Sequence, residues 1–539
     1  KFLLNTPANI NLNWVDKLRI EQEFKRMPDS TWVLANENTY VNFYIVKGAQ
    51  QLYAHQLRNF DKYQFDVQNA DSIFGLLGPI HELPEATAQT DTFWIHNRHV
   101  PLKEKESALD DLLAQLRKVP AFNVIIKTAE ILITGYIPTT ADKDKSKFDF
   151  GPMNTTFSAN HLEGFRMRVG GMTTANLNPH WFGSGYLAYG VNDRKLKYNA
   201  KLTYSVNKKK YHEGESPVNN ISAIQEYDVY TPGQDFLFTS KDNMFVAWKV
   251  GEPVTMMQYI RKTMLQYQKE WLNGLTLTTW ARNENNEAAG TLRYDRYDAD
   301  GTLTNLKSFT NTELGTQLRF APGERAYNGR EGKNSLFNLS KDAPVFKLSH
   351  QMGLKNVLGS DFNYNHTEIS AEKRIWLSSF GHIDALVTAG KVWDKVPFPL
   401  LIMPNTNQSI TIQPQAFNMM RALEFVSDQY VSFYFTYYMK GWILNRIPGV
   451  KWLRLREVIS FSGFYGGLTD KNNPALDPTG LYRFPEGTSP MGRTPYLEAS
   501  VGLENIFKIL RIDYYRRLTY LDQPNIKKGG VRIALRFSF

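Results

Sequence analysis

The last residues of the chain alternate between apolar and polar side chains. Val531, Ile533, Leu535, Phe537 and Phe539 occupy the odd positions, and arginine, alanine and serine occupy the even ones. Because the side chains of a strand point alternately to its two faces, this pattern predicts a strand with one apolar and one polar face. By itself the pattern suits both the last strand of a soluble sheet and a strand of a membrane barrel.

The same alternation recurs from about residue 163 to the end. In the segment 196–206, leucine, tyrosine, alanine and valine take the even positions, and lysine, asparagine, threonine and serine take the odd ones. Three further segments of this type are 165–169, 431–440 and 496–504. Except for the shorter 165–169, these segments run for about nine to eleven residues, long enough for a tilted strand to cross a bilayer. Their apolar faces include tyrosine, a residue that gathers at membrane interfaces, and their connections range from short to long. These properties favour a membrane barrel over a soluble sandwich.

We therefore predict an all-β dominated fold, a transmembrane antiparallel β-barrel of about 16 strands over residues 163–539. Residues 1–100 lack long aromatic faces and show strands joined by a polar turn at 27–30, which predicts a soluble β-rich periplasmic domain. Residues 101–162 are expected to contain lead-in strands and a short amphipathic helix, whose leucines have a helical spacing. Those leucines are Leu109, Leu112, Leu113 and Leu116.

Composition narrows the classes of function. The chain has 539 residues, a net charge of +10 and 13% aromatic residues, and its mean hydropathy is −0.41. Its apolar runs are much shorter than the roughly 20 residues of a transmembrane helix. It contains no cysteine, which excludes disulfides and thiolate metal sites. Lysine and arginine are scattered along strands instead of being clustered, so we expect no nucleic-acid partner.

Motifs for catalysis are missing from the sequence. His96 and His99 lack the HExxH spacing of a zinc protease, and neither a GxSxG elbow nor a phosphate-binding loop occurs. We therefore expect a non-enzymatic protein with no catalytic residues, no cofactor and no metal.

One segment carries a family resemblance. An Asn-x-x-Glu-Gly motif is formed by Asn160, Glu163 and Gly164, and a Gly-Tyr-Leu-Ala-Tyr-Gly segment leads to Asp193. This part of the chain resembles a family of Bacteroidota outer-membrane proteins whose members have a carboxypeptidase-like regulatory domain before the barrel. That domain is absent from the sequence, so the resemblance implies that the chain is the C-terminal part of a longer protein.

The C-terminal third is similar to the BamA/TamA-like assembly barrels, notably at 443–467 and 495–518. This resemblance implies that the aromatic end, with Phe537 and Phe539, is the signal by which the barrel is recognised for assembly. The Arg-Gly-Phe or Arg-Gly-Tyr loop tip of those insertases has no match here, so insertase activity is not implied.

The resemblances imply a role in outer-membrane biogenesis or protein assembly, as part of a larger envelope complex. The alternative is a channel or transporter component for uptake of nutrients or polymers. The expected location is the outer membrane of a Gram-negative bacterium, with the N-terminal part in the periplasm. Expected partners are outer-membrane lipids, lipopolysaccharide and other outer-membrane or periplasmic proteins.

The barrel interior is expected to be filled. Basic and acidic side chains share the inward positions of the predicted strands, and unpaired buried charges are costly. The loops from Pro397 to Asp428 and from Thr469 to Pro495 are long enough to fold inward. We therefore predict paired charges and a plugged or capped barrel. The predicted inward charges are Arg166, Arg168, Lys195, Lys197, Lys201, Arg511, Arg532, Arg536, Glu498, Glu504 and Asp513.

Overall fold

The computed structural model describes residues 15–43, 52–65, 68, 89–97, 135–140, 142, 145–237, 239–250, 254–324, 342–524 and 526–536. The chain divides into two compact units, Lys1–Ala129 with Phe537–Phe539, and Glu130–Arg536. The helix predicted around Leu109–Leu116 lies outside the described residues, as do Phe537 and Phe539.

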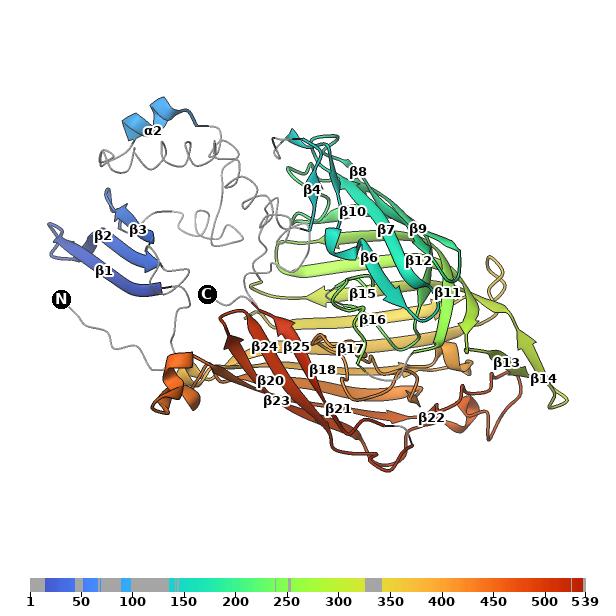
Figure 1. The fold of residues 1–539 in the computed structure, drawn as a ribbon. Coiled ribbons are helices and arrows are strands. Elements are labelled where there is room, and N and C mark those ends of the chain that lie inside the picture. The colour runs from blue at the N-terminus through green and yellow to red at the C-terminus, as the bar shows by residue number, and fades with distance from the viewer. Residues whose placement is uncertain are drawn as a thin grey trace. The chain divides into compact units, whose positions relative to one another are not determined.

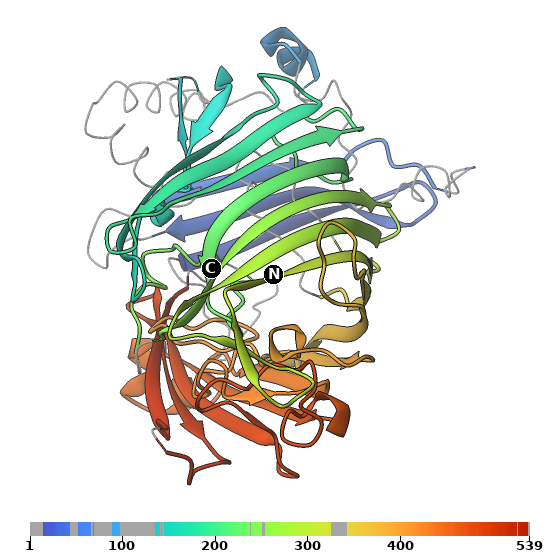
Figure 2. The same cartoon turned by 90° about the vertical axis from the view of Figure 1, so that its right-hand side faces the viewer.

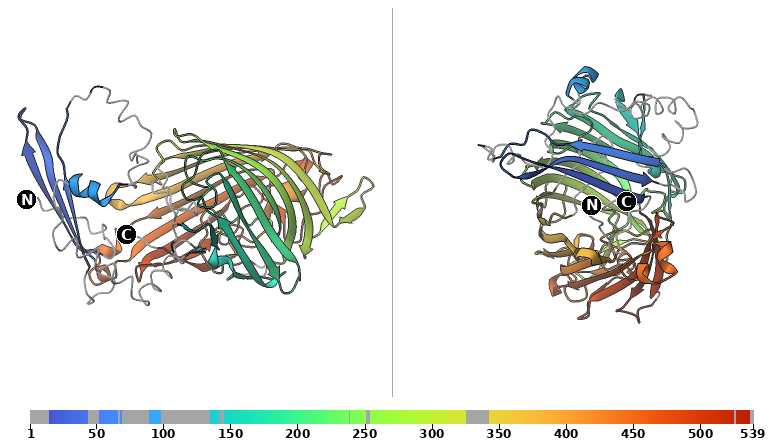
Figure 3. Two further views of the ribbon diagram at one scale, coloured as in Figure 1. Left: turned by 90° about the horizontal axis from the view of Figure 1, so that it is seen from above. Right: turned by 90° about the vertical axis from the view of Figure 1, so that its left-hand side faces the viewer.

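The first unit contains a three-stranded antiparallel sheet in the order β1-β2-β3 (Figure 3, right). Its strands are β1 (Val15–Arg26), β2 (Trp32–Phe43) and β3 (Leu52–Asn59). The predicted polar turn at 27–30 is present, closed by a hydrogen bond from the Ser30 N–H to the Met27 carbonyl at 2.9 Å. A short helix, α2 (Asp91–Asn97), follows.

The second unit is a closed barrel, and its neighbouring strands pair in antiparallel fashion in the described part of the chain. Its long strands follow one another in chain order as one curved wall (Figures 1 and 2). The strands are β4 (Ile137–Pro138), β5 (Phe148–Phe150), β6 (Phe157–Asn160), β7 (Gly164–Thr173), β8 (Trp181–Gly190), β9 (Leu196–Ser205), β10 (Asn219–Tyr230), β11 (Met256–Glu270), β12 (Leu275–Gly290), β15 (Ser308–Phe320), β16 (Val345–Gly353), β17 (Tyr364–Trp376), β18 (His382–Val392), β20 (Gln429–Tyr438), β21 (Arg456–Gly467), β23 (Tyr496–Ile506), β24 (Leu510–Arg517) and β25 (Gly529–Leu535).

The barrel confirms the predicted fold class and has 18 strands in its described part, against about 16 predicted. The difference lies in the short strands at the start. β5 and β6 pair with successive parts of the same strand, β7, so they form one interrupted strand. The break between them contains the 3₁₀ turn η2 (Met153–Thr155). These strands place the start of the barrel sheet before residue 163, because β4, β5 and β6 are too short to show the long alternation.

Polar side chains face the interior and apolar ones face outward. In β9, Leu196 and Leu202 are 57% and 52% exposed, whereas Lys197 and Thr203 are fully buried. A soluble protein would show the reverse burial, whereas a lipid-facing apolar surface around a polar interior is the arrangement of outer-membrane-type barrels. The two faces predicted from the alternation are confirmed.

Smaller elements connect the strands. A hairpin of β13 (Tyr294–Tyr297) and β14 (Leu303–Leu306) lies beyond the barrel wall (Figure 1). β19 (Phe425–Val426) and β22 (Ser489–Pro490) pair in parallel between two long loops. Among the described residues, no helix has the length and apolarity to cross a membrane. The remaining 3₁₀ turns are η4 (Ser378–Phe380), η5 (Phe398–Leu400), η6 (Leu444–Arg446), η7 (Val450–Leu453) and η8 (Asp470–Asn472).

Candidate functional site

Two long loops fold inward and contact the inner wall of the barrel. Loop A comprises the described residues of 231–255, between β10 and β11, and loop B comprises residues 393–428, between β18 and β20. A third, loop C (468–495), lies between β21 and β23 and pairs with loop B through β19 and β22. Together these loops and the wall positions that anchor them form the candidate site.

Loop B is anchored by buried charges on the last strands. The carboxylate of Glu498 on β23 accepts hydrogen bonds from the backbone N–H groups of Asn418 and Met419, both at 2.9 Å. Arg517 on β24 makes a paired contact with Glu424 of loop B, with distances of 3.0 and 2.6 Å. These contacts confirm that the loop predicted from Pro397 to Asp428 folds inward, because inward-facing strand residues hold its backbone.

Loop B also carries a compact aromatic core. Phe417, Met420 and Phe425 of the loop pack in one buried cluster with Phe464 and Tyr496 of the wall. The rings of Phe417 and Tyr496 meet edge to face with their centroids 5.5 Å apart, a preferred geometry of aromatic pairs. Loop B is therefore packed inside the barrel as a small apolar core.

Loop A is anchored by a network of several ion pairs. The Arg166 guanidinium on β7 binds the Asp228 carboxylate on β10 at 2.7 and 2.9 Å and Asp242 of loop A at 3.2 Å. Arg168 binds the same Asp242 at 2.8 Å, and Lys241 of loop A binds Asp228 at 2.9 Å. We call these five residues the β7–loop A network. Each charge has an opposite partner, which is the condition for burying it.

The motif residues of the sequence analysis adjoin this network. Glu163 binds Arg166 at 2.8 Å and Lys197 at 2.7 Å, and Asp193 binds Lys197 at 2.5 Å. The Asn160 side-chain oxygen accepts the Glu163 N–H at 2.8 Å, which closes the turn between β6 and β7. The structure thus brings Asn160, Glu163 and Asp193 together around buried cations, with a structural role.

Gly164 follows directly in the same turn. Its φ of +66° is in the left-handed region, and an added Cβ would lie 2.5 Å from the Asn192 side chain. Only glycine fits this position without displacing its neighbour.

Most of the other predicted inward charges are also paired. Lys201 binds Glu213 at 2.8 Å, and Arg511 and Arg536 bind Asp513 and Glu504 at 2.5 and 3.2 Å. Arg532 departs from this pattern, because its Nη atoms donate to the carbonyl oxygens of Val531 and Asn418. Lys195 is a peripheral case, bound to Glu287 at 3.4 Å with both side chains well exposed.

Sequence reasoning missed Asp228, Asp242 and the inward course of loop A. Asp228 could have been found, because it continues the polar even positions of β10 after Ser222 and Glu226. Asp242 lies in a loop with no periodicity, so the pattern of polar residues could not assign it to Arg166.

The edge of β25 is covered by loop B. The Ile533 N–H donates to the Ile410 carbonyl at 2.9 Å, and the Ile412 N–H donates to the Ile533 carbonyl at 2.8 Å. Thr411 and Ile533 form a parallel bridge between them. β24 pairs with β25 on its other side, and β4 follows β25 in the order of the closed barrel. Loop B therefore covers the edge of β25 around Ile533.

Loop A continues this arrangement. The Ile410 N–H donates to the Trp248 carbonyl at 2.7 Å, and the Val250 N–H donates to the Gln408 carbonyl at 2.9 Å. Further along loop A, the Met244 N–H donates to the Asn154 carbonyl of η2 at 2.9 Å. A chain of backbone hydrogen bonds therefore leads from β25 through both loops to the break between β5 and β6. We call this connection the seam.

Three comparisons relate the chain to known proteins. Residues 129–472 match the model described as "Family of unknown function (DUF5686) C-terminal domain". No curated protein matches the chain in a sequence search.

Two solved structures are similar at low identity. BamA from Haemophilus ducreyi lacking POTRA domains 1–3 has 9% identity and a TM-score of 0.45, covering 77% of this chain and 78% of that chain. CdiB from Acinetobacter baumannii has 11% identity and a TM-score of 0.34, covering 70% of this chain and 57% of that chain. No residue role is transferred from either protein.

Proposed function

This chain belongs to the DUF5686 family, and from the barrel that it forms we propose a non-enzymatic role in outer-membrane biogenesis or protein assembly. In this proposal the barrel lies in the outer membrane of a Gram-negative bacterium, and the N-terminal unit lies in the periplasm. It works within a larger envelope complex, surrounded by lipids and lipopolysaccharide.

The observation that carries the proposal is the covered edge of β25. A strand edge offers unpaired N–H and C=O groups to any extended chain, and recognition by strand addition uses such edges. At Ile533 the cover consists of two backbone hydrogen bonds to Ile410 and Ile412. Each such bond contributes only about 0.5 to 1.5 kcal/mol net. A longer extended segment of another envelope protein can therefore replace loop B at this edge.

The filled interior supports this role over the alternative, an uptake channel or transporter. The Lys and Arg side chains at inward positions favour the channel, but most of them are paired, and loop B packs an apolar core between the walls. We expect the purified protein to conduct little current in planar bilayers. Large, steady single-channel currents would favour the channel instead.

Locking the seam tests the proposed role. The chain contains no cysteine, so Thr411→Cys with Ile533→Cys creates a single disulfide between loop B and β25, at a pair that forms a β-bridge. The matched control is Leu265→Cys with Ala281→Cys, which joins neighbouring residues on the continuous pair β11 and β12.

We expect the oxidised seam variant, as the only copy in its bacterium, to lower the amounts of other barrel proteins in the outer membrane. A reductant should restore them, and the control pair should have no effect. Unchanged amounts with the seam fully oxidised would contradict the proposal. Purification from native membranes, followed by mass spectrometry, should in addition recover other envelope proteins with the wild-type chain.

A further inference from the structure

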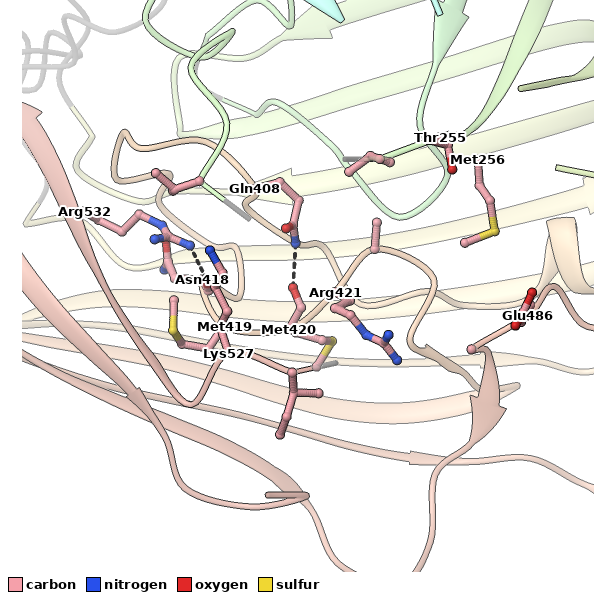
Figure 4. Close-up of a pocket in the computed structure, with 15 residues that line it drawn as sticks. Thr255, Met256, Gln408, Asn418, Met419, Met420, Arg421, Glu486, Lys527 and Arg532 are labelled. Atoms are coloured by element: carbon pink, nitrogen blue, oxygen red, sulfur yellow. Dashed lines mark hydrogen bonds between the residues drawn. The ribbon is translucent and has the colours of Figure 1, made fainter. Parts of the chain in front are cut away.

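A cavity of about 310 Å³ lies where loop B, loop C and β25 meet. Residues Asn418 to Arg421 of loop B run along it, and Arg532 projects into it from β25 (Figure 4). Glu486 from loop C and Lys527 from the connection before β25 complete its charged lining. Its volume is at the lower end of the range typical of small-molecule sites.

In the described part of the chain, the cations of this cavity form no close ion pair, although the buried carboxylate of Glu498 interacts electrostatically with Arg532. Among the residues that the structure describes, Arg421, Lys527 and Arg532 form no ion pair with a carboxylate. Arg532 is 3% exposed, and its Nε, like that of Arg421, is buried without a hydrogen-bond partner. Elsewhere in the interior, buried arginines such as Arg166 and Arg517 bind carboxylates. The Nε atoms of the ion-paired Arg166, Arg168 and Arg282 are also buried without a hydrogen-bond partner. Among the described residues, Arg421 and Arg532 differ from them in forming no ion pair, which leaves their guanidinium groups available to an anion.

Apolar side chains also line the cavity, among them Met256, Met419, Met420, Val250 and Ile526. They lie beside the polar side chains of Thr255, Gln408 and Asn418. Methionine side chains are flexible and adapt to apolar groups of varied shape. An inorganic ion needs only a small part of the volume, because a water molecule occupies about 30 Å³ in the liquid. The lining therefore suits a molecule with both an anionic and an apolar part.

We infer that this cavity binds an amphiphilic anion, a phosphate group attached to an apolar body. Arg421, Lys527 and Arg532 bind the phosphate through charge-assisted hydrogen bonds, which guanidinium groups form well with phosphate. The methionines and Val250 cover the apolar part. The inference does not depend on the proposed role in assembly. Val250 and Gln408 of the seam line the cavity, but Ile410, Thr411, Ile412 and Ile533, the residues of the bridge to be locked, do not.

Calorimetric titration of the full chain in a nonionic detergent tests the site. The probes are hexyl phosphate, inorganic phosphate and hexanol. We expect hexyl phosphate to bind at a saturable site at least tenfold more tightly than inorganic phosphate, because each buried CH₂ group adds about 0.8 kcal/mol. Hexanol should not bind measurably. Equal affinity for inorganic phosphate would overturn the amphiphilic assignment in favour of a free-phosphate site.

Variants locate the binding to this cavity. Lys527→Gln changes an exposed side chain, and combined with Arg421→Gln it should weaken hexyl phosphate binding about tenfold or more, while retaining the thermal unfolding transition of wild type. The matched control, Lys528→Gln, removes the same charge one residue away, outside the lining. Equal weakening by the control, or no weakening by the double variant, would overturn the inference.

Discussion

Loops A and B enter the same barrel and are held there by different interactions. Loop A is attached through Asp242 and Lys241, whose partners are charges on β7 and β10. Loop B has one buried ion pair, between Glu424 and Arg517, but it also carries its own aromatic cluster around Phe417 and Met420. Charge pairs need correct partners at fixed positions, whereas apolar packing needs volume and shape. The two loops should therefore respond to different substitutions, although they are hydrogen-bonded to each other at the seam.

The largest expected effect is on the side of loop A. Arg166→Gln removes the cation shared by Glu163, Asp228 and Asp242. Breaking a buried ion pair from one side costs about 3 to 5 kcal/mol, because the remaining charge stays buried without a partner. Denaturant unfolding in lipid should show this loss, and amide exchange should accelerate in 239–250 more than in 405–421. Arg168→Gln, at a guanidinium that is 12% exposed, should cost less. Equal acceleration in both loops would contradict the separate anchoring.

Met420→Ala tests the anchoring of loop B by apolar packing. The Met420 side chain is 1% exposed within the aromatic cluster, and truncating a buried methionine to alanine costs about 2 to 5 kcal/mol. Amide exchange should now accelerate in 405–421 and change little in 239–250. Met244→Ala in loop A, at a side chain that is 49% exposed, serves as the control and should stay within about 0.5 kcal/mol of wild type. A comparable loss in the control would argue against the loop B core.

A substitution on the outer face of the barrel tests a contribution to stability that depends on neither loop. Leu202→Arg places a charge at a position that faces away from both loops and is 52% exposed. Such a change costs about 2 to 4 kcal/mol at the bilayer midplane and less near the interfaces. Folding titrations into lipid vesicles should show it, with exchange in both loops unchanged, and Leu202→Met should cost less than about 1.5 kcal/mol. Tolerance of arginine equal to that of methionine would count against a lipid-facing surface.

The smallest expected effect comes from removing one hydrogen bond of the β7–loop A network. The Tyr186 hydroxyl donates to the Asp228 carboxylate at 2.5 Å, next to Arg166 and Lys241. Tyr186→Phe should cost about 1.5 to 3 kcal/mol, the net value of one hydrogen bond to a charged group. The measurement is again denaturant unfolding, with Tyr189→Phe, at a side chain that is 45% exposed, as the neutral reference. No loss at Tyr186 would show that the ion pairs alone carry the network.

The alternation of apolar and polar residues within single segments predicted the barrel. It could not predict which residues far apart in the chain meet at the candidate site. The faces of β9 follow from alternation alone, as Leu202 and Thr203 show. Pairing of inward charges and the entry of loop B followed from the cost of buried charge. The seam could not be predicted, because its bonds join Trp248 to Ile410 and Ile410 to Ile533, and no periodicity relates these residues. The role of Phe539 as an assembly signal stays a prediction.

The seam also constrains the order in which the barrel can be completed. Ile533, close to the end of the chain, bonds to Ile410, and Ile410 bonds to Trp248. Contacts between residues so far apart in sequence form slowly, because long stretches of chain must first be ordered. The bonds of Ile533 to loop B require loop B to lie inside the barrel. We therefore expect them to form late in folding, after loop B has entered the interior.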